Sequence, residues 1–193
     1  MPRIGVYPGS FNPPTRAHLE IALTARSVHG LERVDLAVSS VSLGKEDTTV
    51  PHLEHRLHVL RATIERVPGL GLHVTEAQMI VDIADGYDVV VMGADKWVQV
   101  NDPAWYGGDP VARDEALARL PTLALAPRDP HRVPDEHRLP VADDLLEVSS
   151  TAARGGRVEW MTEAAAEFDR ATGAWTDEAR YQAWLRDHRP PDR

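Results

Sequence analysis

The chain contains no cysteine, so disulfide bonds and thiolate metal ligands are excluded. It also has no apolar run approaching the roughly 18 residues that span a bilayer, and no apolar N-terminal segment with a cleavage site. We therefore expect a cytoplasmic protein that does not bind membranes.

Positive charge is scarce, because 21 Lys and Arg oppose 30 Asp and Glu, for a formal net charge of −9. That balance argues against nucleic acid as a partner, although local amides and a few cations can still bind small anionic substrates.

Hydrophobic residues make up 42% of the 193 residues, enough for one domain with a full core. Short apolar runs alternate with longer segments of helical periodicity, which is typical of an α/β protein with a parallel sheet. Strands are expected at residues 3–7, 34–38, 71–75, 88–92, 122–126 and 145–148, and helices at 16–29, 52–66, 76–84 and 110–119. The pattern predicts a Rossmann-like, doubly wound sheet with helices on both faces and a ligand outside the carboxyl ends of the strands.

The tail from residue 156 onward follows a different pattern. Aromatic and apolar residues recur at helical spacing on both sides of Gly173, which predicts two short helices. We divide the chain into a Rossmann-like domain, residues 1–155, and a helical C-terminal extension, residues 156–193, packed on it. The tail aromatics are expected to pack on this domain or on another subunit. The sequence therefore allows both a monomer and a homo-oligomer.

A first signature, residues 9–18, follows the first expected strand and reads Gly-Ser-Phe-Asn-Pro-Pro-Thr-Arg-Ala-His. Gly9 allows the main chain to approach an anion closely, and the helix that begins beyond it supplies free N–H groups and a partial positive charge. If Thr15 caps that helix, His18 is its third residue, and both side chains face the same ligand. Phosphate is the expected ligand.

Three segments resemble a known family. The first signature resembles the Gly-x-Phe-x-Pro-x-(His or Thr)-x-x-His motif of the nucleotidyltransferases that include the nicotinate and nicotinamide mononucleotide adenylyltransferases. A second signature, residues 149–154, resembles their Ser-Ser-Thr-x-x-Arg motif. Gly93-Ala94-Asp95 follows an apolar run, where that family carries Gly-x-Asp at the end of a strand. Three motifs in this order, covering roughly residues 3–155, make the resemblance specific.

The resemblance implies in-line attack by an acceptor phosphate on the α-phosphorus of a nucleoside triphosphate, with release of pyrophosphate and no covalent intermediate on the enzyme. His18, Thr15 and Arg154 are the implied catalytic residues, with His18 at the α-phosphate. The implied ligands of the nucleotide and its phosphates are Gly9, Ser10, Phe11, Gly93, Asp95, Ser149, Ser150, Thr151 and, as the weaker candidate, Lys45. Mg²⁺ is the expected cofactor, because it bridges phosphate oxygens while keeping much of its water shell, so no metal site built from protein side chains is required.

The Ser-Phe-Asn-Pro segment and Thr15 most closely resemble the branch that joins ATP to nicotinate or nicotinamide mononucleotide in NAD biosynthesis. In that branch a Trp stacks near the pyridine ring, and Trp97 or Trp105 is the weak candidate here. One alternative keeps the chemistry and changes the acceptor to phosphopantetheine, a sugar phosphate or an alcohol phosphate, with ATP or CTP as donor. The other is a non-catalytic nucleotide-binding protein of the same fold, which the unusual Gly155-Gly156 pair leaves open.

His52, His55 and His58 recur at spacing three within an expected helix, which imitates a metal-binding face. No Asp, Glu or Cys cluster converges on them in the sequence, so we interpret them as a solvated helix face. Arg56, in the same helix, resembles an arginine common in relatives, and we assign it a structural role.

Overall fold

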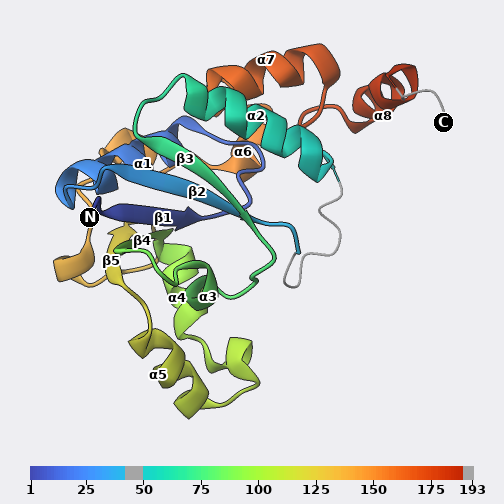
Figure 1. The fold of residues 1–193 in the computed structure, drawn as a ribbon. Helices are drawn as coiled ribbons and strands as arrows, with labels where there is room; N and C mark the ends of the chain where they lie inside the picture. Colours follow the sequence, from blue (N-terminus) through green and yellow to red (C-terminus); the bar gives the residue numbers. More distant parts are fainter. Residues whose placement is uncertain (42–49, 189–193) are drawn as a thin grey trace.

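The structure, a computed structural model, describes residues 1–41 and 50–188. Its centre is a parallel sheet in the order β3-β2-β1-β4-β5 (Figure 1). The strands are β1 Ile4–Pro8, β2 Arg33–Ser39, β3 Leu70–Thr75, β4 Val89–Gly93 and β5 Thr122–Ala126. Because the chain order reverses between β1 and β4, the carboxyl ends of these two strands form the crevice where doubly wound sheets bind ligands.

Alternate residues of the central strands face opposite layers of helices. Val89 and Val91 pack in one core with α1 (Arg16–Val28) and α2 (Leu53–Glu65). Val90 and Met92 pack in a second core with α3 (Ile80–Ile83) and α4 (Ala94–Asn101). A fifth helix, α5 (Pro110–Ala118), lies beyond α4 and contacts it (Figure 1). The prediction of a doubly wound sheet with helices on both faces is therefore confirmed.

Two predicted elements differ from the structure. Residues 145–148, predicted as a strand, lie at the end of a short 3-10 helix, Asp143–Leu145, and the turn that follows it. The Val148 N–H bonds to the Leu145 carbonyl at 3.1 Å, a local turn bond that competes with strand pairing. Two aspartates at the start of this segment favour such turns. The helix predicted at residues 76–84 is only the single turn α3, since Glu76 and the residues up to Met79 are not helical.

The tail forms the two predicted helices and folds back onto the sheet domain. After α6 (Ser150–Arg154), α7 (Glu163–Thr172) and α8 (Glu178–Asp187) follow, with Gly173 ending α7 at a φ of 76°. Trp175 and Tyr181 are buried in a third core that includes Val59 of α2. Figure 1 shows α7 running alongside α2. The tail aromatics therefore pack within the chain.

The interpretation of the α2 histidines as a solvated helix face is wrong for His55. His52 and His58 are exposed, but His55 is partly buried, and its Nδ1 lies 2.6 Å from the hydroxyl of Tyr181. Burial lowers the pKa of His55. Its ring also meets Trp184 edge to face, with centroids 5.2 Å apart. The spacing of these histidines in the sequence did not indicate that the C-terminal extension would cover His55.

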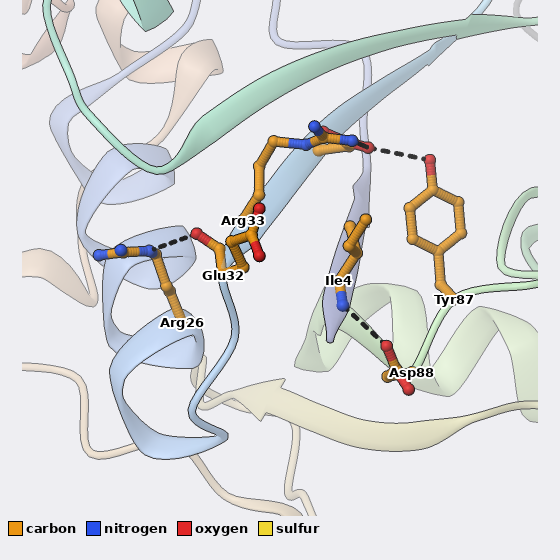
Figure 2. A network of polar contacts seen from close by, with 7 residues as sticks. Ile4, Arg26, Glu32, Arg33, Tyr87 and Asp88 are labelled. Atoms are coloured by element: carbon orange, nitrogen blue, oxygen red, sulfur yellow. Dashed lines mark hydrogen bonds and ion pairs between the residues drawn. The ribbon is translucent and has the colours of Figure 1, made fainter. Parts of the chain in front are cut away.

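A polar network fixes the opposite, amino-terminal end of the sheet (Figure 2). Asp35 is 6% exposed and accepts a hydrogen bond from Arg33 Nε at 2.6 Å and another from the Tyr87 hydroxyl at 3.2 Å. The Asp88 carboxylate accepts from the Ile4 N–H at 2.7 Å, joining the start of β1 to the approach to β4. These contacts stabilise the sheet and do not belong to the ligand crevice, which lies at the other end of the strands. No helix within the described residues is both long and apolar enough to cross a membrane.

Candidate active site

Two adjoining clefts open at the carboxyl ends of β1 and β4. The larger has a volume of about 470 Å³ and the smaller about 180 Å³. Both are lined by the start of the first signature and by the turn after β4; the shared residues are Pro8, Gly9, Ser10, Asp95 and Lys96. The topology thus brings together the two segments that the sequence placed at the ends of separate strands. Asp95 is the only acidic residue among the described residues that line these clefts.

His18 lines the smaller cleft and is held by Thr15 in one protonation form. Thr15 is the cap before α1, and its N–H donates to His18 Nδ1 at 3.0 Å. The Thr15 hydroxyl lies 2.9 Å from the same nitrogen. Because Nδ1 accepts the main-chain hydrogen bond, the proton of the neutral ring sits on Nε2. Thr15 stands directly before α1, as predicted, but it is 1% exposed and lines neither cleft. Its contact with Nδ1 makes His18 a hydrogen-bond donor through Nε2.

Burial keeps this ring neutral. Desolvation, reinforced by the positive charge of Arg128, lowers the pKa of His18 to about 4. The ring packs edge to face on Phe11, with centroids 5.1 Å apart, and Phe11 itself is 1% exposed. Phe11 has a φ of 43°, a left-handed conformation that side chains other than glycine rarely adopt. A strained loop residue therefore supports the ring at the cleft.

At two turns of the site, side chains approach the main chain of a glycine closely. A Cβ on Gly9 would stand 3.0 Å from the Phe11 ring. A Cβ on Gly93 would stand 2.6 Å from a carboxylate oxygen of Asp95, which folds back over it. Both values are closer than a Cβ normally approaches another heavy atom, so a larger residue at either position would shift the Phe11 ring or the Asp95 carboxylate.

The larger cleft holds an arginine whose charge is only partly compensated. Arg56, 7% exposed, donates from Nη1 to the Ser10 carbonyl at 3.2 Å. Its buried Nε has no hydrogen-bond partner among the described residues. Burial lowers the pKa of this guanidinium, and such a group gains most from an anionic partner. The structural role assigned from the sequence is therefore incomplete, because Arg56 also lines the cleft.

The two tryptophan candidates occupy different places. Trp105 lines the larger cleft, on the 3-10 helix Pro103–Tyr106. Trp97 packs against the second core, and its carbonyl accepts a hydrogen bond from the side chain of Asn101 at 2.7 Å. The geometry therefore favours Trp105 as the ring that meets a ligand. Sequence spacing alone did not separate the two.

The second signature contacts the first directly. Ser150 Oγ donates to the Pro13 carbonyl at 2.7 Å, and Arg154 Nη1 donates to the Asn12 carbonyl. Arg154 Nη2 also reaches the Thr151 hydroxyl at 3.3 Å. Ser149 caps its own helix, because its hydroxyl accepts from the Ala152 N–H at 3.1 Å. Several groups expected to face phosphate thus hold the first signature or α6 in this structure. The helix ends at Arg154, directly before the pair Gly155-Gly156.

Arg128 is a residue of the site that the sequence interpretation missed. It follows β5 and lines the smaller cleft with His18. Its sequence signal was weak, because it was only an arginine just past the carboxyl end of the strand predicted at residues 122–126. Lys45 lies outside the described residues.

One group of side chains has the donor types of a metal site. His52, Glu54 and His55 bring nitrogen and oxygen atoms within 4.8 Å of one another. All three come from the start of α2, and both His52 and Glu54 are exposed. Glu54 was not part of the histidine pattern in the sequence analysis. None of the three residues lines either cleft.

Comparison with known proteins agrees with this geometry. The profile of the cytidylyltransferase-like family matches residues 6–156. A probable nicotinate-nucleotide adenylyltransferase of Salinibacter ruber is 25% identical over 169 residues, which are 80% of this chain and 85% of that protein. A phosphopantetheine adenylyltransferase of Desulforamulus reducens is 34% identical over 87 residues, which are 45% of each protein.

A solved structure shares the fold. The Plasmodium falciparum nicotinic acid mononucleotide adenylyltransferase complexed with APC has a TM-score of 0.63 and 12% sequence identity, and the match covers 89% of this chain and 96% of that one. The same enzyme complexed with NaAD gives a TM-score of 0.60. The family profile spans both signatures and the turn after β4, so the resemblance to nucleotidyltransferases is confirmed. The chain belongs to the cytidylyltransferase-like family.

Proposed function

We propose that this protein is an adenylyltransferase that transfers AMP from ATP to nicotinate or nicotinamide mononucleotide and releases pyrophosphate, a step of NAD biosynthesis. The family match and the name of the Salinibacter ruber relative support this reaction class and this acceptor. The observation that carries the proposal is His18, a neutral donor held by Thr15 in a cleft at the switch point of the sheet.

In the proposed reaction an oxygen of the acceptor phosphate attacks the α-phosphorus of ATP. A new P–O bond forms, the bond from the α-phosphorus to the bridging oxygen breaks, and pyrophosphate takes the electron pair. The attacking oxygen is already anionic, so no protein base is needed. His18 Nε2–H donates to an α-phosphate oxygen as its charge rises, and the amides of the first signature at the start of α1 add to this stabilisation.

The two clefts divide the substrates. The smaller cleft, with His18 and Arg128, would take the nucleotide, and Asp95 between the clefts would accept hydrogen bonds from ribose hydroxyls. The larger cleft would take the acceptor: Arg56 would offer its guanidinium to the phosphate, and Trp105 a ring to the pyridine. Arg154 and Thr151 stay proposed ligands of the outer phosphates.

We also propose Mg²⁺ as the cofactor. A single carboxylate in the described walls of the clefts fits an ion held mainly by phosphate oxygens and water, and does not fit a cage of protein ligands. When bound, the ion neutralises phosphate charge during the transfer.

A second candidate acceptor is phosphopantetheine, because the Desulforamulus reducens relative of that name is 34% identical to nearly half of this chain. The two acceptors are separated by measuring pyrophosphate release with Mg²⁺, crossing ATP and CTP with nicotinate mononucleotide, nicotinamide mononucleotide, phosphopantetheine and glycerol phosphate. Turnover with ATP and one pyridine mononucleotide supports the proposal. Turnover with phosphopantetheine alone replaces it, and silence with every pair favours a non-catalytic nucleotide-binding protein.

A further inference from the structure

Four acceptor atoms of the first signature are held by the C-terminal quarter of the chain. They belong to three consecutive residues, Asn12, Pro13 and Pro14. The carbonyls of Asn12 and Pro13 accept from Arg154 and Ser150, and the Pro14 carbonyl accepts from the N–H of Thr162 at 3.0 Å. The fourth atom, Asn12 Oδ1, accepts from the indole Nε1–H of Trp175 at 2.6 Å. The tail thus reaches the loop that carries the proposed chemistry.

This loop depends on such outside contacts. Pro13 and Pro14 have no N–H, so the loop can donate few hydrogen bonds of its own. Phe11, just before Asn12, has a left-handed φ that its surroundings must maintain. Asn12 is 4% exposed, so water cannot easily replace a lost partner of its amide oxygen.

Contacts within the C-terminal tail hold Trp175 in place independently of its hydrogen bond to the loop. Its main-chain N–H donates to Asp169 Oδ1 at 2.7 Å, and Asp169 is a 5% exposed residue of α7. The same carboxylate accepts from the main-chain N–H of Thr176 at 3.1 Å and from its hydroxyl at 2.6 Å. The Trp175 side chain is 6% exposed and packs edge to face on Phe168. A buried, preorganised donor therefore points at Asn12.

We infer that Trp175 is a positioning residue for catalysis, which holds Asn12 and through it the support of His18. The inference rests on the proposed function. Asn12 directly follows Phe11, whose ring supports His18, and lies three residues before Thr15, whose N–H holds Nδ1. A shift of the Asn12 side chain is therefore transmitted to both supports of the ring, and misplacing a catalytic donor by a fraction of an ångström slows a reaction that depends on positioning.

Trp175→Phe tests this role, because it keeps a ring and removes the N–H. We expect kcat to fall about 10-fold, while the KM for ATP changes less than about threefold, since the lost contact matters most in the transition state. Trp184→Phe is the matched control. Trp184 belongs to the same aromatic cluster, and its indole N–H has no hydrogen-bond partner within residues 1–41 and 50–188, so kcat should stay within about twofold of wild type.

A double-mutant cycle separates positioning from packing. Asn12→Ala removes the acceptor, so adding Trp175→Phe to it should lower kcat by less than about twofold more. If Trp175→Phe lowers kcat by the same factor with and without the Asn12 amide, the indole acts only through packing and the inference is wrong. It is also wrong if Trp175→Phe alone leaves kcat unchanged.

A measurement on the intact wild-type chain needs no substrate. The indole N–H of Trp175, assigned by its loss in Trp175→Phe, should exchange with D₂O at least about 10-fold faster in Asn12→Ala than in wild type. Equal exchange rates would overturn the inference. If no pyridine mononucleotide is turned over, the proposed function fails on its own, whereas the exchange rates and the cycle, run with whichever acceptor is active, still decide the role of Trp175.

Discussion

The two ring nitrogens of His18 meet different surroundings, and that difference sets its chemistry. Nδ1 accepts from the Thr15 main chain, so Nε2 carries the proton of the neutral ring. The sequence placed His18 and Thr15 in one helical turn, and this part of the site was predictable from spacing. The buried environment was not, because Phe11, Tyr7 and Arg128 come together around the ring only in the folded sheet.

The neutral state of His18 has a consequence for stability. Its pKa is about 4 in the folded protein and near 6.5 in an unfolded chain. Between these values the unfolded state binds a proton that the folded state does not. This residue therefore makes the protein less stable as pH falls from 6.5 toward 4, and has no effect above that range. Below pH 4 its destabilisation is complete.

We predict that His18→Asn removes this dependence, since an amide oxygen can still accept from the Thr15 N–H but does not titrate. From pH 7 to 4.5, wild type should lose about 2 kcal/mol more of its free energy of unfolding than the variant. Urea unfolding of both proteins at the two pH values measures the difference. Equal losses would show that His18 is not desolvated in the folded state.

Arg56 can be tested through the acceptor. We predict that Arg56→Gln raises the KM for the phosphorylated acceptor about 10- to 100-fold and changes the KM for ATP less than about threefold, because its guanidinium lines the larger cleft. Steady-state kinetics with each substrate varied in turn give both values. Arg61→Gln, an exposed residue of the same helix, is the control. An increase confined to the KM for ATP would contradict this assignment and place the nucleotide in the larger cleft and the acceptor in the smaller one.

At the scale of elements, the strands were predictable where apolar runs were long and uninterrupted, as in residues 89–92 of β4. The segment 145–148 was not, because its four residues fit a strand and a turn equally well until the preceding aspartates are considered. The choice between Trp97 and Trp105 failed for another reason. Both lie near the predicted turn, and only the packing of α4 on the sheet shows which ring lines the cleft.

The polar network at the amino end of the sheet should affect stability and not activity. We predict that Asp35→Asn lowers the free energy of unfolding by about 1–3 kcal/mol, since it weakens a buried carboxylate bonded to Arg33 and Tyr87. The kcat should stay within about twofold of wild type, because the clefts lie at the other end of the strands. Urea unfolding and turnover check the two effects, with exposed Asp85→Asn as the control. A large loss of kcat in the folded variant would contradict this separation.

At the scale of the whole molecule, an acidic protein forms a site for anions by concentrating a few donors at one edge of its sheet. The net charge argued against nucleic acid as a partner but said nothing about this arrangement. The sequence also gave no sign that the tail would reach the first signature, because Trp175 and Asn12 are 163 residues apart. The sequence motifs identify the residues of the site, whereas long-range contacts of this kind determine where those residues lie.

The most direct test of the central claim is formation of the dinucleotide from Mg²⁺-ATP and nicotinate or nicotinamide mononucleotide, followed by mass spectrometry in wild type and His18→Ala. We predict dinucleotide and pyrophosphate in equal amounts with wild type, and a rate at least about 100-fold lower with the variant, because the donor to the α-phosphate is lost. Undiminished synthesis by folded His18→Ala would contradict the role of this residue. If wild type forms no dinucleotide from either acceptor, the proposed function is wrong.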